Sequence, residues 1–307
     1  MDRKIWINGD YVNWEDASVH ILSHSHQRGS LIFGFTPIFK NDSGTHIFRL
    51  DKHTDRLFKS CETAGIPLDY SKNEIKDGII DTVRTNPGSK FIKISVYIAS
   101  VEIDVVPQDP FTTVAIAAYE PQEDIIEKNS QPFHSSQELS VWIEKVRHQR
   151  RPDIIDPQVK IAANYTSPMM AKWEARKNGY DEIILTDSEG YVTEAPTSNV
   201  FIVNSEGVLM TAHEDDILHG ITRMSILEIA EDEGLKVNVG KVPLKDLEEA
   251  KEVFVTSSSH LVCPVIKIDG NPVGDGKVGE ITNLLKQRFQ EVISGKDNKF
   301  QEWLYKI

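Results

Sequence analysis

Lys160 is the residue with the clearest potential for chemistry, because it stands in a short apolar run, VKIAANY, between Val159 and Ile161. An amine in apolar surroundings is desolvated, and desolvation brings its pKa towards the range in which a lysine attacks carbonyl carbons and carries protons. We expect this run to be a short β-type segment. Taken alone, the run is compatible with a reactive amine and with an ordinary strand-edge lysine that points to solvent.

The sequence Gly220-Ile221-Thr222, at the start of an expected helix, is suited to binding an anion. The N–H groups in the first turn of a helix have no partner within the helix, and a glycine before them lets them converge on one ligand. Thr222 adds a hydroxyl. Because the chain carries a formal net charge of −13, an anionic ligand needs such local donors.

Glu194 ends the strand-like run YVTE and precedes Ala195 and Pro196. The residue before a proline is biased away from helix, so we expect the chain to turn here and direct the carboxylate inward. Asp187–Gly190 and Asn204–Gly207 are turn sequences between β-rich flanks, which predicts that each separates two strands.

The elements of the first third alternate between strands and helices. The Asn8-Gly9 pair between apolar runs predicts a hairpin, and Asp51 is expected to cap a helix that Gly65 ends. The buried stripe of that helix should contain Leu57, Cys61 and Ala64.

A second helix should follow a capping box formed by Ser71 and Glu74. From residue 91 the apolar period changes to two, which predicts a strand. Its packed face should carry Ile92, Ile94 and Val96, and its other face Phe91, Lys93, Ser95 and Tyr97.

These elements predict an α+β protein of two domains, since the length exceeds that of an average domain. Prolines and charges gather between the strand-like run TTVAIAAY and residue 134. We expect a small N-terminal domain over residues 1–120, a linker over 121–134 and a large domain over 135–307.

The composition argues against several classes of binding partner. A net charge of −13 repels nucleic acid and anionic membranes, and no segment reaches membrane-spanning length. The two cysteines, Cys61 and Cys263, lie far apart without a metal-ligand pattern, so we expect neither a disulfide nor a metal site. A reducing, cytoplasmic location fits best.

Several runs, in this order and spacing, resemble the class IV, or fold-type IV, aminotransferases, in particular branched-chain and D-amino-acid aminotransferases. The similarity covers nearly the whole chain. The runs are HTDRL (53–57), VKIAANY (159–165), EIILTDSEGYVTEAPTSNVF (182–201), ILHGITR (217–223), FVTSSS (254–259) and GDGKVGEIT (274–282).

The resemblance implies a homodimer of two-domain subunits, with a β-barrel-like core in the large α/β domain, and pyridoxal 5′-phosphate as cofactor. Lys160 would hold the cofactor as a Schiff base, Glu194 would face its ring nitrogen, and Tyr165 would lie beside its hydroxyl. The residues implied for the phosphate group are Arg56, Gly220, Ile221, Thr222, Ser257 and Ser258.

The implied reaction is transamination between an amino acid, either a branched-chain L- or a D-amino acid, and a 2-oxo acid. The lyase activity of the related aminodeoxychorismate lyases and a cofactor-binding protein without turnover are the alternatives. This chain departs from its relatives in the substrate region: Lys93 and Tyr97 stand where one or the other subgroup has arginine. Arg28, Phe33 and Lys93 are the substrate-binding candidates that remain.

Overall fold

The computed structural model describes residues 3–129, 136–145 and 151–307. The chain divides into two compact units. The first contains the described residues up to 129 together with 159–163 and 292–307, and the second contains 136–145, 151–158 and 164–291. Both units mix helices and strands, which confirms the α+β prediction.

The first unit is built on a seven-stranded sheet in the order β18-β4-β3-β5-β6-β1-β2, and all its pairs are antiparallel. Its Asn8-Gly9 hairpin is confirmed, because both residues have positive φ, 48° and 105°. Its strands are β1 (Lys4–Ile7), β2 (Asp10–Asn13), β3 (Leu31–Asn41), β4 (Gly44–Phe48), β5 (Phe91–Ile98), β6 (Thr112–Tyr119) and β18 (Leu304–Lys306).

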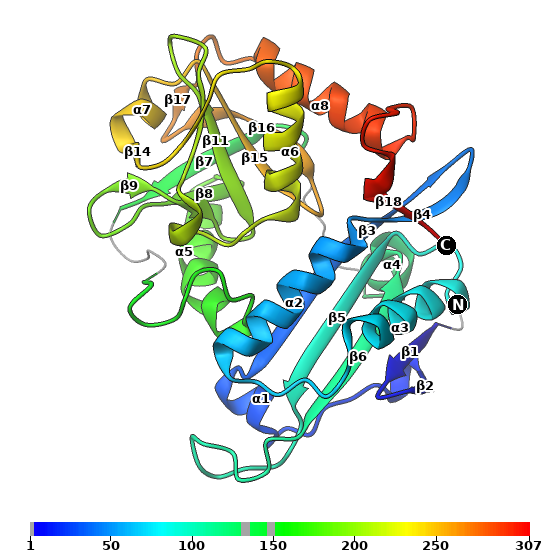
Figure 1. Cartoon of the computed structure of the whole chain (residues 1–307). Coiled ribbons are helices and arrows are strands. Elements are labelled where there is room, and N and C mark those ends of the chain that lie inside the picture. Colours follow the sequence, from blue (N-terminus) through cyan, green and yellow to red (C-terminus); the bar gives the residue numbers. More distant parts are fainter. Residues whose placement is uncertain (1–2, 130–135, 146–150) are drawn as a thin grey trace. The chain divides into compact units, whose positions relative to one another are not determined.

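Helices α2 (Leu50–Ala64) and α3 (Lys72–Thr85) lie along one face of this sheet (Figure 1). The capping box of α3 is confirmed, with both reciprocal hydrogen bonds between Ser71 and Glu74. The expected cap of α2 is wrong: Arg49, in a left-handed conformation, holds the cap position, and Asp51 lies within the first turn. The remaining short helices are η1 (Trp14–Asp16), α1 (His24–Arg28), η2 (Gln122–Ile126), α4 (Glu127–Asn129) and η5 (Gln301–Trp303).

The core of the first unit forms between the sheet and these helices. Leu57 and Cys61 of α2 and the alternate residues of β5 pack into it, as the period of each element predicts. Ala64 is exposed, so its place in the buried stripe was wrong. Residues 62–64, which follow Cys61, are exposed, and Gly65 ends the helix directly after them in the left-handed conformation.

The second unit contains a nine-stranded sheet whose main path is β13-β12-β11-β15-β16-β7-β8. Strand β10 pairs with β11 and β17 with β16, while β9 and β14 form a separate pair. Its strands are β7 (Leu139–Glu144), β8 (Glu182–Leu185), β9 (Tyr191–Val192), β10 (Glu194–Ala195), β11 (Ser198–Val203), β12 (Leu209–Thr211), β13 (Val237–Val239), β14 (Val242–Pro243), β15 (Glu252–Ser257), β16 (Leu261–Ile268) and β17 (Asn271–Pro272).

The predicted turns Asp187–Gly190 and Asn204–Gly207 separate neighbouring strands of this unit, as expected. Helix α6 packs against β15 and β13. The helices of this part of the chain are η3 (Ala162–Tyr165), α5 (Thr166–Lys177), η4 (Glu214–Asp216), α6 (Ile221–Asp232), α7 (Leu244–Glu248) and α8 (Glu280–Ile293).

The segment expected to link the domains is partly helical. Residues 122–129 form η2 and α4, which are grouped with the first unit, and residues 130–134 lie outside the described residues. Asp124 of η2 is buried and accepts a hydrogen bond from the Arg3 guanidinium at 2.9 Å. This ion pair connects η2 to the residue directly before β1.

Candidate active site

Lys160 lies in the first unit, where two hydrogen bonds to its main chain hold it in place. Its N–H donates to the Ser60 hydroxyl of α2 at 3.1 Å, and its carbonyl accepts from the Phe33 N–H of β3 at 3.1 Å. The expected β-type run is wrong: residue 161 makes a single bridge to Ile32, and a 3-10 helix starts at Ala162. Tertiary contacts, rather than a strand, fix this lysine.

The face of α2 beside Lys160 is polar. Arg49, His53, Arg56 and Ser60 recur at helical spacing along it. His53 is 5% exposed, and neither of its ring nitrogens has a hydrogen-bond partner among the described residues. Burial lowers the pKa of His53 well below 6.5, and the charges of Arg56, Lys160 and Arg49, in that order, lower it further. The ring is therefore neutral in a positively charged setting.

Phe33 brings two lysines together in the first unit. The Nζ atoms of Lys160 and Lys93 lie 4.8 Å and 5.3 Å from the centroid of its ring. Lys93 is exposed and lies on the face of β5 opposite Ile92, Ile94 and Val96, as the alternation predicts. Of the substrate-binding candidates, Phe33 therefore contacts Lys160, and Lys93 lies near the same Phe33 ring.

Arg28, the third candidate, is exposed and makes different contacts. Its guanidinium donates to the carbonyls of Gln27 and Ile103, both at 3.3 Å. Gly29 ends α1 with φ 73°, and a Cβ at this glycine would meet Ala163 at 3.2 Å. Gly29 thus provides a left-handed turn and space for the segment that follows Lys160.

Glu194 lies in the second unit, where it is 2% exposed. Its carboxylate accepts the Leu218 N–H, with distances of 3.2 Å and 3.4 Å to the two oxygens, and lies 3.5 Å from the Asn199 side-chain nitrogen. A buried carboxylate needs donors or a cation beside it. The predicted inward direction of this side chain is confirmed.

The N-cap residue of α6 is Gly220, and in the part of the chain that the structure describes it makes no side-chain capping bond to the first turn of the helix. Thr222 and Arg223 in its first turn are both buried. The Arg223 guanidinium donates to the Thr211 hydroxyl at 3.3 Å and to the Ala212 carbonyl at 2.8 Å. Burial lowers the pKa of Arg223, and the charges of Glu214 and Glu194 counteract this.

The other predicted cofactor residues also fall in the second unit. Tyr165 ends η3 and is half-buried. Ser257 is the last residue of β15, its hydroxyl lies 3.1 Å from that of Ser259, and Ser258 is half-buried. Beside them Thr256 is 1% exposed, and its hydroxyl has no partner among the residues that the structure describes.

Sequence reasoning missed His53, Asn199, Arg223 and Thr256. The helical spacing of polar residues around HTDRL was a signal for His53. Asn199 and Thr256 required the register of β10, β11 and β15, which no local pattern contains.

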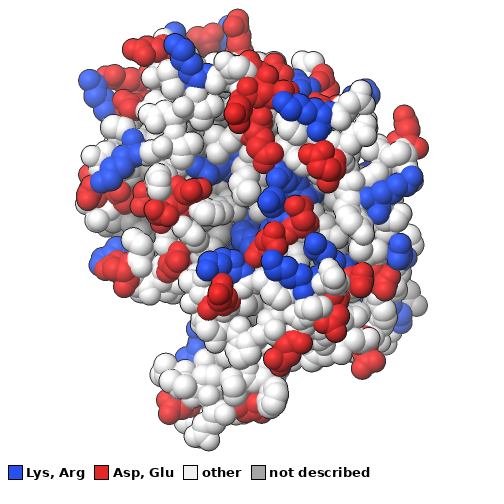
Figure 2. Space-filling view, viewed as in Figure 1, with Lys and Arg blue, Asp and Glu red and all other residues white. Residues whose placement is uncertain are grey.

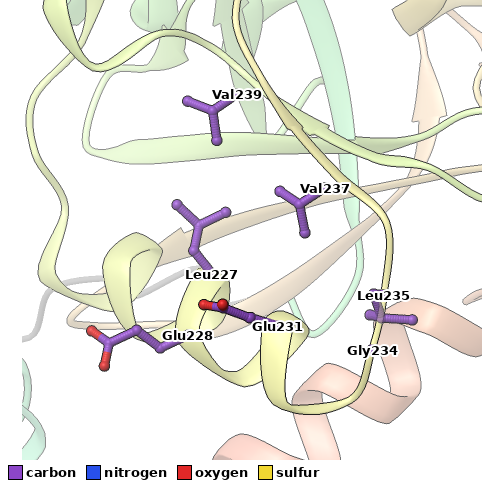
Figure 3. A pocket seen from close by; sticks show the side chains of 7 residues that line it. All are labelled: Leu227, Glu228, Glu231, Gly234, Leu235, Val237 and Val239. Carbon is purple, nitrogen blue, oxygen red and sulfur yellow. The ribbon is translucent and has the colours of Figure 1, made fainter.

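The outer side of α6 carries a separate hollow of about 380 Å³ (Figure 3). Leu227, Leu235, Val237 and Val239 line it, with the carboxylates of Glu228 and Glu231. These residues come from the body of α6, from the turn that follows it and from β13, so the hollow is distinct from the N-terminus of the helix. Two carboxylates at its wall make it unsuited to a phosphate.

The surface is mixed in charge. Figure 2 shows acidic and basic side chains interspersed over the visible face. In residues 3–129, 136–145 and 151–307, no helix combines the length and apolar character needed to cross a bilayer.

Comparison with known proteins identifies the family. The model of amino-transferase class IV matches residues 40–268. The chain belongs to the class IV aminotransferase family. A Pseudomonas aeruginosa branched-chain-amino-acid aminotransferase is 32% identical over 303 residues, which cover 98% of this chain and 96% of the relative. The predicted family is therefore confirmed.

Solved structures agree with this assignment. The branched-chain aminotransferase of Thermoproteus uzoniensis, crystallised with norvaline, superposes with a TM-score of 0.88 at 30% identity and covers 99% of both chains. Another branched-chain amino acid aminotransferase, solved in complex with N-(5′-phosphopyridoxyl)-L-glutamate, has a TM-score of 0.90 at 28% identity and covers 100% of this chain and 99% of its own. The predicted fold-type IV architecture is confirmed.

This class IV aminotransferase is a pyridoxal-phosphate-dependent enzyme that acts on amino acids and 2-oxo acids. The described residues fit the cofactor in each unit taken alone. The first unit has an amine in the family position and a buried imidazole with unpartnered nitrogens. The second has a buried carboxylate, a helix N-terminus that begins at a glycine and, within the described residues, a Thr256 hydroxyl without a partner.

Proposed function

We propose that the enzyme transfers the amino group of a branched-chain L-amino acid to a 2-oxo acid, with Lys160 as the residue that bonds covalently to pyridoxal 5′-phosphate. The observation that supports this proposal is the position of Lys160. Its main chain is hydrogen-bonded on both sides, while its half-buried side chain places the amine beside the Phe33 ring. We propose branched-chain substrates because the relatives from Pseudomonas aeruginosa and Thermoproteus uzoniensis are branched-chain aminotransferases.

The cofactor supplies an aldehyde that bonds to amines and a ring that accepts the electron pair released at the substrate Cα. Lys160 would hold the cofactor covalently through Nζ, and movement of the same Nζ towards the substrate would let it carry the proton taken from Cα. The fixed main chain of Lys160 limits this movement to the side chain, which keeps the amine within reach of the substrate.

Glu194 would hold a proton on the cofactor's ring nitrogen. A buried carboxylate favours a positive charge beside it, and a protonated ring nitrogen makes the ring a stronger electron acceptor. The Leu218 N–H fixes the direction of this carboxylate. Tyr165 would donate to the cofactor's hydroxyl oxygen.

The phosphate group would be bound by the N–H groups at the start of α6, with the donors assigned from the family resemblance. Its N-cap residue, Gly220, makes no side-chain capping bond within the described residues, which favours an anion at this helix terminus. Arg56 would add a positive charge. The full set proposed for the phosphate is Arg56, Gly220, Ile221, Thr222, Ser257 and Ser258.

Lys93 is our preferred anchor for the substrate carboxylate, because its Nζ and that of Lys160 lie near the same Phe33 ring. Phe33 would contact the apolar substrate side chain. Arg28 would act more weakly, because its guanidinium already contacts main-chain carbonyls of residues 27 and 103.

We also propose that the enzyme is a cytoplasmic homodimer. The loop between β5 and β6, at the bottom of Figure 1, exposes large apolar side chains, and the corresponding projection in Figure 2 is mostly uncharged. Such a surface favours burial against another copy. Its exposed residues are Val101, Ile103, Val105, Val106 and Phe111. Two free, buried cysteines fit a reducing compartment.

A screen of amino donors tests the function. Purified enzyme is given L-leucine, D-alanine, D-glutamate or an arylalkylamine, with 2-oxoglutarate or pyruvate as acceptor. We expect L-leucine with 2-oxoglutarate to react fastest, and the Lys160→Ala variant to lose both turnover and the visible absorption of the bound cofactor. A clear preference for D-alanine would contradict the proposed substrate, and a Lys160→Ala variant with near wild-type turnover would contradict the mechanism.

A further inference from the structure

Three buried polar residues form a row across the sheet of the second unit. Glu194 of β10 is paired directly with Asn199 of β11, and Asn199 is paired with Thr256 of β15. Directly opposite residues in antiparallel strands point to the same face, so the three side chains share one side of the sheet. Their exposed fractions are 2%, 4% and 1%. Asn199 is the central member of this row.

The amide of Asn199 holds the chain before α6. Its Nδ2 donates to the Leu218 carbonyl at 2.9 Å and lies 3.5 Å from a Glu194 carboxylate oxygen. The second distance is long for a hydrogen bond, so the contact with Leu218 is the stronger one. The N–H of Leu218 in turn donates to Glu194. Asn199 therefore reaches Glu194 mainly through the Leu218 main chain.

The oxygen of the same amide lies against Gly220. A Cβ built on Gly220 would lie 1.9 Å from Asn199 Oδ1, far closer than any tolerated contact. The φ of Gly220 is −67°, which any residue adopts, so this position needs glycine for space. One amide thus bonds to Leu218 and leaves no space for a side chain at Gly220, so it meets the turn before α6 at two points.

We propose that Asn199 is a positioning residue that sets the direction of the Glu194 carboxylate and the path of residues 218–220 together. This inference rests on the proposed function, in which Glu194 holds the proton on the cofactor's ring nitrogen and the start of α6 binds its phosphate. A shift of the Asn199 amide would displace the carboxylate and the N–H donors at the same time. Misplacement by about 1 Å costs up to roughly 100-fold in rate.

The coupling between Asn199 and Gly220 is tested first in the apoprotein, where the function plays no part. Thermal unfolding is measured for Gly220→Ala alone and in an Asn199→Ala background. We expect Gly220→Ala to lower the Tm of the wild type clearly and to change the Tm of Asn199→Ala little, because truncation removes the clashing oxygen. Asn199→Asp retains an oxygen there, so Gly220→Ala should remain costly in that background. Equal costs in all three backgrounds would overturn the coupling.

The effect on Glu194 is tested by the ¹⁵N NMR signal of the ring nitrogen in enzyme loaded with ¹⁵N-labelled pyridoxal 5′-phosphate. Asn199→Ala and Asn199→Asp should move the signal towards that of an unprotonated ring and reduce kcat about 10- to 100-fold. Ser198→Ala is the matched control, because this buried neighbour on β11 points to the opposite face of the sheet and should leave the signal unchanged.

Glu194→Gln separates the two proposals. If this variant leaves the ring-nitrogen signal unchanged, the role proposed for Glu194 fails. If Glu194→Gln moves the signal while both Asn199 variants leave it at the wild-type position, the role of Glu194 stands and the inference about Asn199 is overturned.

Discussion

His53 should make the stability of the apoprotein depend on pH. Its imidazole is buried on α2, and both ring nitrogens lack hydrogen-bond partners among the described residues. Burial is the main reason why its pKa lies well below 6.5, and the neighbouring positive charges contribute further. The perturbation that tests this is His53→Leu, which removes the titratable group and keeps a similar volume.

The direction of this pH dependence follows from whether the folded or the unfolded chain binds the proton. The unfolded chain protonates this histidine below about pH 6.5, whereas the folded chain keeps it neutral until a much lower pH. The unfolded state therefore binds more protons as the pH falls, and folding stability decreases. Between neutral pH and pH 5 the loss is at most about 2 kcal/mol, which is the free energy that the unfolded chain gains by protonating a histidine of ordinary pKa. For a unit of this size that is roughly 4–8 °C in Tm.

The assay is thermal unfolding of the apoprotein at several pH values between 7.5 and 5. The difference in Tm between wild type and His53→Leu should widen in favour of the variant as the pH falls below 6.5, since the other titratable groups are shared. His20→Gln, at an exposed position, is the control and should follow the wild type. Parallel curves for wild type and His53→Leu would refute the reasoning.

Three further changes have defined outcomes. Thr256→Val should leave the Tm of the apoprotein unchanged or raise it, because the Thr256 hydroxyl has no partner among the described residues. The same variant should weaken pyridoxal 5′-phosphate binding about tenfold in an absorbance titration, and unchanged affinity would exclude this hydroxyl from the cofactor site. Arg3→Met leaves Asp124 buried without its cation and should cost about 3–5 kcal/mol in urea unfolding; a cost below 1 kcal/mol would contradict the buried pair. Lys93→Ala should lower kcat/KM for amino-acid donors roughly 3- to 30-fold, a modest effect because Lys93 is exposed, and no loss would remove it as the carboxylate anchor.

Features that depend on neighbouring residues could be predicted from the sequence. The Asn8-Gly9 turn, the capping box of Ser71 and Glu74, and the alternation along β5 each follow from local chemistry. The helix that begins at residue 221 and the glycine before it are also local features, and so the sequence could predict an anion-binding potential for Gly220-Ile221-Thr222.

Features that depend on distant residues could not be predicted in this way. Lys160 was expected in a strand because its neighbours are apolar, but its backbone bonds go to Ser60 and Phe33, far away in the sequence. The polar row of Glu194, Asn199 and Thr256 exists only once three strands are in register. Arg49 displaced Asp51 as the cap of α2 because its N–H bonds to Trp303, near the other end of the chain.

Residues 159–163 are grouped with the first unit although the chain on both sides belongs to the second. The bond between Lys160 and Ser60 closes a loop with a sequence separation of 100 residues. Loops of this length are entropically costly to close, so such contacts form late in folding, after the sheet and α2 that receive them. Newly synthesised chains should therefore acquire stable secondary structure before Lys160 forms its hydrogen bond with Ser60. A fragment that ends at residue 129 would contain Ser60 but not the lysine that bonds to it.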